Sequence, residues 1–452
     1  MSSTNTITRT EFAEQEFSPR RFEVFTERHL DRIDALRHLS EQHRFDIRVV
    51  ANVLPFRVNR YVVESLVDWD AAPNDPLFRL LFPQREMLDE SDFTRMADLL
   101  RRDVDRESIN NAAWAIREKL NPHPADQLAL NRPTDAAGQV VNGIQHKYRE
   151  TVLFFPSQGQ TCHSYCTFCF RWAQFVGDKA LRISSSEART IHDYLRHHRE
   201  VTDLLVTGGD PMVMKTRSLA AYLDGLVHPD FDHVQTIRIG TKSLSFWPHR
   251  YVTDPDADDM LRLLERLVEA GKHVSIMAHY NHWRELEPDI AREAIRRLRD
   301  TGVAIRSQGP LLNHINNDAA VWSRLWNEQV KLGIVPYYMD TGAQHYFEVP
   351  LSRAWEIYRD AMSQVSGLGR TARGPSMSAS PGKVEIQGVA EIHGEKVFVC
   401  RFVQGRNPEW VQQPFFARYD DQATWFDDLK PAFGESSFFF EEEFREMVQG
   451  TA

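Results

Sequence analysis

Residues 151–169, TVLFFPSQGQTCHSYCTFC, decide the fold prediction. A short apolar run, Thr151–Pro156, leads directly into a loop that holds Cys162, Cys166 and Cys169. Six such runs that alternate with helical stretches predict a parallel α/β architecture. We therefore expect a partial (β/α)6 barrel of the TIM type, with its chemistry at the carboxyl ends of the strands. The five later apolar runs are residues 203–207, 236–240, 273–278, 303–307 and 333–338.

The predicted barrel, residues 146–345, is flanked by two regions of a different character. Residues 1–145 are predicted to be mainly helical, because apolar and charged residues recur there at helical spacing between Pro- and Asn-containing breakers. Residues 346–452 begin with a helical stretch and a Gly-, Ser- and Pro-rich loop over 367–382. An alternating segment around a His-Gly pair then predicts a β-hairpin, and an amphipathic tail predicts a helix. The candidate N-terminal helices are residues 22–41, 60–69, 92–104 and 108–120.

The composition indicates a globular protein and argues against several function classes. Of 452 residues, 42% are hydrophobic and 26% are charged, which is ordinary for globular domains. The formal net charge of -10 argues against a general nucleic-acid binder. The chain has no apolar run long enough to cross a membrane, and its N-terminus has no apolar core of a secretory signal. We expect a cytoplasmic protein without a membrane or nucleic-acid partner.

Three cysteines on one loop form a ligand set for a soft metal centre. Their spacing lets the loop place Cys162, Cys166 and Cys169 around one centre, and thiolates favour zinc or iron–sulfur clusters. A structural zinc site takes four ligands, so a zinc knuckle would need His163 or His146 as the fourth. Three cysteines around a four-iron cluster instead leave one iron free to bind S-adenosylmethionine through its amino and carboxylate groups. Three buried structural cysteines are the remaining alternative.

The second apolar run ends in a turn of two glycines, TGGDP over residues 207–211. Glycines at this place let backbone carbonyls approach a ligand closely. The cysteine spacing after the first strand and the aromatic Phe168 before the third cysteine resemble the radical S-adenosylmethionine superfamily. The resemblance implies that the turn of Gly208, Gly209 and Asp210 holds the amino group of the methionine.

Several strand ends together resemble the lysine 2,3-aminomutase family, which combines the radical cluster with pyridoxal 5′-phosphate. The similarity runs from about residue 45 to about residue 400. The resemblance implies a [4Fe-4S] cluster on the three cysteines, bound S-adenosylmethionine and bound pyridoxal phosphate. The matching segments are HKYRETVLFF, CHSYCTFCFRW, LLVTGGDP, IRIGTK, MAHYNH, SQGPLLNHINND and VPYY.

The resemblance also assigns roles to basic and aromatic residues. Arg171 matches the arginine that pairs with the substrate carboxylate, a task to which the planar guanidinium is suited. Tyr148 and Lys147 match a basic–Tyr pair near the ring and phosphate of the cofactor, and Arg149 is a further candidate for the phosphate. Ordinary exposed residues before the first strand are the alternative reading of this segment.

Polar residues at later strand ends match positions that line the S-adenosylmethionine site. His279 and Gln308 take these places at the ends of the fourth and fifth strands, and Lys242 ends the third. A structural hydrogen-bonding role is the alternative for each of them.

Lys383 matches the lysine that forms the Schiff base with pyridoxal phosphate. It follows Ser-Pro-Gly and precedes the first strand of the predicted hairpin, where the family has a turn with more glycines. Lysine-type enzymes hold the distal ammonium of lysine with two aspartates, but this chain has Ser376 at one place and only Asp340 near the other. The resemblance therefore points away from free lysine as the substrate. Arg370 and Arg373 in the preceding loop are candidates for an acidic group or are solvated.

The resemblance implies an isomerase that moves an α-amino group to Cβ through a 5′-deoxyadenosyl radical. An amino acid is then the substrate, an electron donor such as flavodoxin or ferredoxin is a partner, and the chain forms a homo-oligomer. One alternative is a related enzyme that abstracts hydrogen without migration, giving dehydrogenation, deamination or decarboxylation. The other is a zinc-binding protein without catalytic activity.

Overall fold

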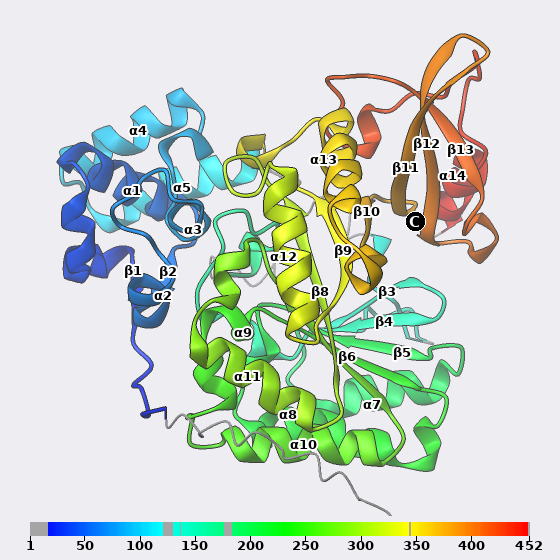
Figure 1. Cartoon of the computed structure of the whole chain (residues 1–452), viewed down its shortest axis with the longest axis horizontal. Coiled ribbons are helices and arrows are strands. Elements are labelled where there is room, and N and C mark those ends of the chain that lie inside the picture. The colour runs from blue at the N-terminus through cyan, green and yellow to red at the C-terminus, as the bar shows by residue number, and fades with distance from the viewer. Residues whose placement is uncertain (1–16, 121–129, 136, 176–182, 343–344, 451–452) are drawn as a thin grey trace, which may run out of the picture.

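The computed structural model describes residues 17–120, 130–135, 137–175, 183–342 and 345–450. In these residues the largest element is one open sheet of 11 strands, in the order β13-β12-β11-β10-β9-β8-β7-β6-β5-β4-β3. Its six central strands are parallel and follow one another in chain order, which confirms the predicted alternation (Figure 1). They are β4 (Thr151–Phe154), β5 (Asp203–Val206), β6 (Thr236–Thr241), β7 (His273–His279), β8 (Ala304–Leu311) and β9 (Val335–Thr341).

Each connection between two consecutive parallel strands contains a helix (Figure 1). Because sequential strands are adjacent and crossovers are right-handed, these helices gather on one face of the sheet. In the helix before β8, the buried residues Ile290, Ala294 and Leu298 recur at helical spacing and face the sheet. The helices are α7 (Ala188–His197), α8 (Thr216–Leu223), α10 (Ala257–Glu269), α11 (Asp289–Asp300) and α12 (Ala319–Lys331).

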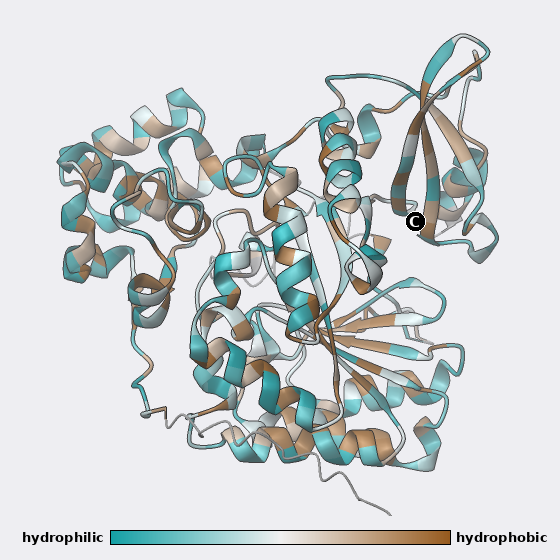
Figure 2. Cartoon of the chain, in the orientation of Figure 1, coloured by the Kyte–Doolittle hydropathy of each residue, from teal (hydrophilic) through white to brown (hydrophobic). Residues whose placement is uncertain are grey.

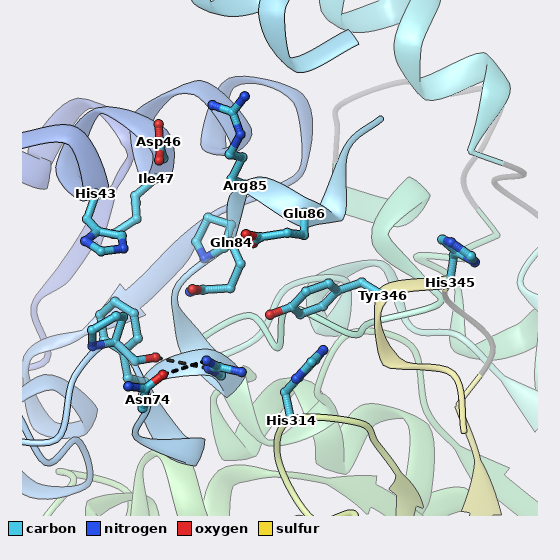
Figure 3. A pocket seen from close by; sticks show the side chains of 14 residues that line it. His43, Asp46, Ile47, Asn74, Gln84, Arg85, Glu86, His314, His345 and Tyr346 are labelled. Atoms are coloured by element: carbon cyan, nitrogen blue, oxygen red, sulfur yellow. Dashed lines mark hydrogen bonds between the residues drawn. The ribbon is translucent and has the colours of Figure 1, made fainter. Parts of the chain in front are cut away.

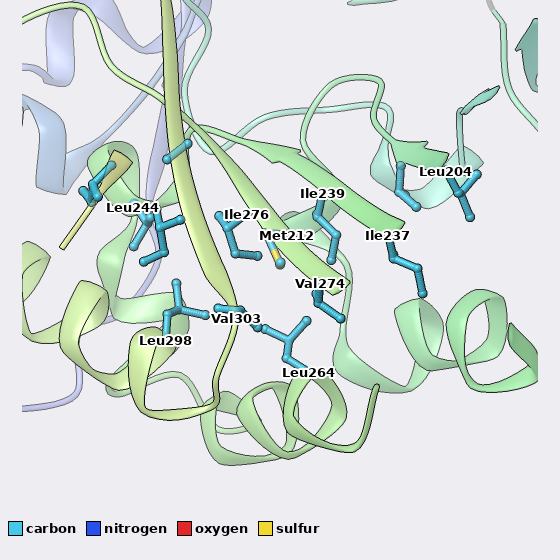
Figure 4. Close-up of a cluster of buried hydrophobic side chains, with 14 of the residues drawn as sticks. Leu204, Met212, Ile237, Ile239, Leu244, Leu264, Val274, Ile276, Leu298 and Val303 are labelled. Atoms are coloured by element: carbon cyan, nitrogen blue, oxygen red, sulfur yellow. The ribbon is translucent and has the colours of Figure 1, made fainter. Parts of the chain in front are cut away.

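The main core lies between this helical layer and the sheet. Ile237, Val274 and Ile276 from the strands meet Leu264 and Leu298 from the helices, and all five are fully buried or nearly so (Figure 4). The strands are accordingly the most hydrophobic ribbons of this part of the chain, whereas the helices carry polar residues on their outer side (Figure 2). No helix of the described residues is long and apolar enough to cross a membrane.

The N-terminal part is mainly helical, as predicted, but its first segment differs. Residues 22–41 do not form the expected helix; they hold a short strand, β1 (Val24–Thr26), and two 3-10 turns, Glu27–Arg32 and Asp34–His38. β1 pairs with β2 (Arg57–Asn59) in a separate two-stranded sheet. The helices are α1 (Glu41–Val53), α2 (Arg60–Ser65), α3 (Pro76–Leu81), α4 (Glu90–Arg101) and α5 (Arg106–Lys119).

The C-terminal part continues the 11-stranded sheet. The segment predicted as a loop over residues 367–382 contains a strand, β10 (Arg373–Ser378), which pairs with β9 in parallel and with β11 in antiparallel orientation. This strand escaped the prediction because Arg-Gly-Pro-Ser-Met-Ser has no apolar alternation. The predicted hairpin is confirmed as β11 (Gly382–Ile392) and β12 (Glu395–Gly405), joined by a left-handed His-Gly turn.

The remaining strands lie at the two ends of the sheet, and two further helices belong to the C-terminal part. β3 (Ile144–Tyr148) forms the other edge of the sheet beside β4. The predicted tail helix is α14 (Glu441–Gly450), whose Glu443 accepts hydrogen bonds from Asn407 and from the indole of Trp410. The remaining elements are α13 (Leu351–Ser363) and β13 (Pro414–Arg418).

Candidate functional site

A cavity of about 330 Å³ opens at the carboxyl ends of the parallel strands. Side chains from β3, β7, β8, β9, β10 and β11 line it, together with residues of the cysteine loop. Segments that are far apart in sequence therefore converge at the edge of the sheet where the prediction placed the chemistry. Six predicted site residues line the cavity: Lys147, Tyr148, Arg171, His279, Gln308 and Lys383.

Lys383 lies in this cavity as the second residue of β11, so it is part of the strand and does not precede it. Its amine is 2.6 Å from Asp340 Oδ1 and 3.6 Å from the centre of the Tyr338 ring. Ser376 donates a hydrogen bond to the same Asp340 oxygen (2.7 Å). The preceding Gly382 cannot carry a side chain, because a Cβ there would lie 2.7 Å from the Phe402 ring. The single glycine of this turn thus brings the lysine to the cavity.

Lys147 belongs to a group of three cations at one end of the cavity. Burial, and then the charges of Arg406 and Lys383, lower the pKa of Lys147 to about 7. Its amine donates to the carbonyl of Ala379. Two of these basic residues, Lys147 and Lys383, line the cavity, and Asp340 is the one carboxylate among the described lining residues. The excess makes this end of the cavity a place for an anion such as a phosphate.

Arg406 was missed by the sequence analysis. Its guanidinium donates to Ser380 O (2.8 Å) and to Asn131 Oδ1 (2.6 Å), so it holds the segment just before Lys383 against the edge of the cavity. No local pattern marks it, because Asn131 is 275 residues away in the chain. Arg149, the further phosphate candidate, is exposed and does not line the cavity, so that expectation is wrong.

Arg171 presents an unsatisfied cation to the cavity. Its Nη1 is buried and has no hydrogen-bond partner, and the guanidinium lies 4.8 Å from the centre of the Phe155 ring. Burial lowers the pKa of Arg171 to about 10, which still leaves the group charged at neutral pH. A buried charged donor without an acceptor is costly, so this geometry favours an incoming carboxylate.

His279 and Gln308 lie opposite each other on β7 and β8. His279 Nε2 is buried without a partner, and burial lowers the pKa of this imidazole well below its usual value, so it is neutral. Its ring stacks on Phe168 of the cysteine loop with centroids 5.5 Å apart. Gln308 lies in the middle of β8, because this strand continues to Leu311, but it still faces the cavity.

Lys242 has no donor left for a ligand in the described structure. Its amine is 2.6 Å from Glu285 Oε1, 3.0 Å from Asn281 Oδ1 and 3.2 Å from the carbonyl of His279. The structure therefore supports the alternative reading, in which Lys242 fixes the backbone at the end of β7.

The three cysteines are half-buried thiols on one loop, and none of them forms a disulfide in the described residues. Burial raises the pKa of each, to about 11 for Cys169, and the charges of Cys166 and Cys169 add to the rise at Cys162. The loop therefore holds neutral thiols that lose their protons to a bound metal. Phe168 carries this loop to the cavity wall, so a centre held here would border the cavity.

The arrangement fits a cluster better than a zinc knuckle. A zinc ion with bonds of about 2.3 Å would bring its sulfur ligands to about 3.8 Å from one another. In the described residues no group of three or more Cys, His, Asp or Glu is placed to hold a single ion, whereas a four-iron cluster uses a different iron for each cysteine. His146 is engaged elsewhere, with Tyr194 Oη at 2.6 Å and the carbonyl of Arg149 at 3.1 Å.

The two-glycine turn packs directly against the cysteine loop. A Cβ on Gly209 would lie 2.5 Å from the carbonyl oxygen of Thr161, the residue before Cys162, and a Cβ on Gly208 would collide with Gln160. Asp210 is buried and accepts hydrogen bonds from Thr241 Oγ1 (2.7 Å) and from the backbone at Lys242 and Met212. Its carboxylate is therefore used to tie the turn to β6, and burial raises its pKa to about 6.

Asn59 of the N-terminal part holds the cysteine loop from the other side, and the sequence analysis missed it. This fully buried side chain donates to Ser164 Oγ (3.1 Å), His163 O (3.3 Å) and Phe246 O (2.8 Å). The backbone amides of Tyr165 and Thr167 donate to carbonyls of β2 and α3, at Arg57 and Leu80. Hydrogen bonds from the N-terminal part thus help to hold the cysteine loop in place.

Known proteins share this combination of segments. The chain is 29% identical over 401 residues to a putative L-lysine 2,3-aminomutase of Aquifex aeolicus, across 87% of this chain and 92% of the relative. It is 27% identical over 269 residues to the L-lysine 2,3-aminomutase of Fusobacterium nucleatum, across 57% of this chain and 60% of the relative, which is less than two thirds. The chain is therefore similar to lysine 2,3-aminomutases over most of its length.

Other comparisons with known proteins give weaker likenesses. The L-lysine 2,3-aminomutase of Bacillus subtilis is 24% identical over 367 residues, across 80% of this chain and 67% of the relative. Among solved structures, Streptococcus suis SuiB bound to S-adenosylmethionine gives a TM-score of 0.34 at 12% identity, across 61% of this chain and 57% of that chain. A radical SAM methyltransferase from Sphaerobacter thermophilus gives 0.36 at 14% identity, across 51% and 69%. No family model matches the chain.

The departures from the lysine 2,3-aminomutase pattern have distinct positions in the structure. Ser376 and Asp340 are register partners on β10 and β9, and both line the cavity. Arg370 and Arg373 are exposed and do not line it, which supports the reading of solvated arginines.

A larger cavity of about 540 Å³ lies away from this aminomutase-like site (Figure 3). Its walls come from α1, α3 and two loops, and include His43, Glu86, His314 and Tyr346. Arg79, which also lines this cavity, donates hydrogen bonds to Asn74 Oδ1 and to the carbonyl of Pro73. None of the predicted site residues lines it, so we place the chemistry at the smaller cavity.

Proposed function

We propose that the protein is a radical SAM, pyridoxal phosphate-dependent amino-acid 2,3-aminomutase. One observation supports this most: a single cavity joins the amine of Lys383, the unsatisfied guanidinium of Arg171 and the cysteine loop at Phe168. The similarity to lysine 2,3-aminomutases supports the same reaction class. We further propose that the open sheet of six parallel strands is the partial barrel typical of the superfamily.

The donor sets of the cavity and the cysteine loop fit the three groups that this reaction needs. Cys162, Cys166 and Cys169 would hold a [4Fe-4S] cluster, because one loop carries all three and none of them forms a disulfide. The unpartnered His279 Nε2, together with Gln308 and the turn of Gly208 and Gly209, would line S-adenosylmethionine.

Pyridoxal phosphate would occupy the other end of the same cavity. Lys383 supplies the amine for its Schiff base, and Lys147 supplies a cation for its phosphate. Tyr148 is buried beside them, where its ring can contact the cofactor ring.

When bound, these groups supply a 5′-deoxyadenosyl radical and a ring that stabilises the shifting amino group. The chain's own residues bind, orient and exclude water. Arg171 binds the substrate carboxylate, and its aromatic neighbours Phe155 and Phe170 fix the direction of the guanidinium. Asp340 holds the Lys383 amine whenever that amine is free. The buried lining residues Tyr148, Phe168 and Lys383, each 9% exposed, limit the access of water to a bound ligand.

We also propose that a small electron carrier such as flavodoxin or ferredoxin reduces the cluster, and that the chain forms a homo-oligomer. Both follow from the similarity to this family, and the carrier is needed because the cluster must be reduced before it can cleave S-adenosylmethionine.

The test is an anaerobic absorption spectrum of the reconstituted protein beside Lys383→Ala, with Lys215→Ala, an exposed lysine, as the matched control. We expect an iron–sulfur absorption in all three proteins and a Schiff-base absorption that only Lys383→Ala lacks. Borohydride should fix the cofactor to Lys383, which a peptide map identifies. A protein without an iron–sulfur absorption, or with the same Schiff base in Lys383→Ala, would contradict the proposal.

A further inference from the structure

The cavity is short of negative charge. Of the described residues that line it, three are basic, namely Lys147, Arg171 and Lys383, and one is acidic, Asp340. His279 adds no charge, because burial holds its imidazole in the neutral form. The remaining lining residues are neutral, such as Gln145 and Trp425.

Asp340 is already neutralised. Its Oδ1 is 2.6 Å from the Lys383 amine and accepts a hydrogen bond from Ser376 (2.7 Å). The strand register sets this contact, because Ser376 pairs with Asp340 across β10 and β9, and Ser378 pairs with Lys383 across β10 and β11. The ion pair is therefore built into three adjacent strands.

The Lys383–Asp340 ion pair forms again when a substrate is bound. The structure shows where the Lys383 amine lies when it is not joined to the cofactor. A substrate amine takes the place of Lys383 on pyridoxal phosphate, one C=N bond forming as the other breaks, and Lys383 is again a free amine beside Asp340. Asp340 then balances Lys383 and has no charge to offer a second cation.

We infer that this cavity takes an amino acid with an uncharged side chain. The inference rests on the proposed function. A side-chain ammonium would enter a buried site without a carboxylate of its own, which is costly. A side-chain carboxylate would find the basic residues already engaged, since Arg171 binds the substrate's α-carboxylate and Lys147 the phosphate. Apolar partners remain, namely Leu153, Phe170 and Trp425.

The experiment compares L-norleucine with L-lysine, which have the same carbon chain and differ in the terminal ammonium. Each is titrated into the protein loaded with pyridoxal phosphate, without S-adenosylmethionine or reductant, and the change in cofactor absorption gives Kd. We expect norleucine to bind at least about tenfold more tightly than lysine, because the buried ammonium has no free counter-charge. Equal or tighter binding of lysine, or no response to norleucine, overturns the inference.

Asp340→Asn gives a second, independent readout. If Asp340 serves Lys383, the variant changes the Kd of both amino acids by a similar factor. If Asp340 instead binds a substrate ammonium, the variant weakens the binding of lysine alone, and the inference is overturned. A protein that shows no cofactor absorption at all fails differently, because that result overturns the proposed function itself.

Discussion

Replacing Asn59 by alanine tests how the N-terminal part supports the cysteines. This side chain donates to Phe246 O, His163 O and Ser164 Oγ, and its own oxygen accepts the amide of Val62 as the cap of α2. Alanine removes all four hydrogen bonds at a position that has no access to water. The cysteine loop is then held to β2 by hydrogen bonds from backbone amides alone, from Asn59 N to Ser164 Oγ and from Tyr165 N to Arg57 O, while the loop sequence is unchanged.

The expected cost is set by the hydrogen bonds that alanine cannot make. A buried carbonyl left without a donor costs about 1–3 kcal/mol, and removal of a helix cap costs about 1 kcal/mol. Because these hydrogen bonds share one side chain, we expect a combined cost of about 2–3 kcal/mol for opening this region. At 1.4 kcal/mol for each factor of ten, amides of the loop should exchange roughly 30- to 140-fold faster.

Hydrogen exchange measured by mass spectrometry reports this directly. The amides to follow are those of Tyr165 and Thr167, which donate to Arg57 O and Leu80 O. Ser40→Ala is the matched control, because Ser40 caps α1 through His43 but does not touch the loop. Exchange at the loop that is unchanged in Asn59→Ala, or that rises as much in Ser40→Ala, would refute the reasoning.

Three further predictions concern the site itself. Gly209→Ala should lose reconstituted iron, because its Cβ would lie 2.5 Å from Thr161 O. Gly240→Ala, whose Cβ would have its nearest neighbour at 3.4 Å, should keep its iron. Equal iron content in the two variants would count against the packing argument. The probe 4′-deoxypyridoxine 5′-phosphate cannot form a Schiff base, and its affinity should fall as pH rises through about 7, because Lys147 then loses its proton. Lys147→Met should flatten this part of the pH profile. The same pH dependence in the variant would exclude Lys147 as the cause. Arg171→Met should weaken amino-acid binding by about tenfold or more and leave pyridoxal phosphate bound, since a charged hydrogen bond contributes about 1.5–3 kcal/mol. The absorption titration measures this Kd. An unchanged Kd would exclude Arg171 from the carboxylate site.

The parallel strands were predictable because each is a short apolar run, which is a local signal. Lys147, His279 and Gln308 were instead predicted from the resemblance to the lysine 2,3-aminomutase family. The carboxyl ends of parallel strands meet at one edge, so residues predicted separately line one cavity.

The interactions that support the site were not predictable from local patterns. Asn59 reads as an ordinary helix cap, but its partner Ser164 is 105 residues away. Strand β10 forms because β9 and β11 both offer it a ladder, although its own sequence has little strand propensity. Lys242 looked available as a strand-end cation, yet the fully buried Glu285 pairs with it.

Radical cleavage and amino migration in one cavity are the centre of the proposed function. The most direct measurement incubates the reconstituted enzyme with reductant, S-adenosylmethionine and a mixture of neutral L-amino acids, and analyses the products by mass spectrometry. We predict a 3-amino isomer of at least one substrate from the wild type, and none from Cys169→Ala or Lys383→Ala. Formation of 5′-deoxyadenosine without any 3-amino isomer would contradict this function and would favour hydrogen abstraction without migration.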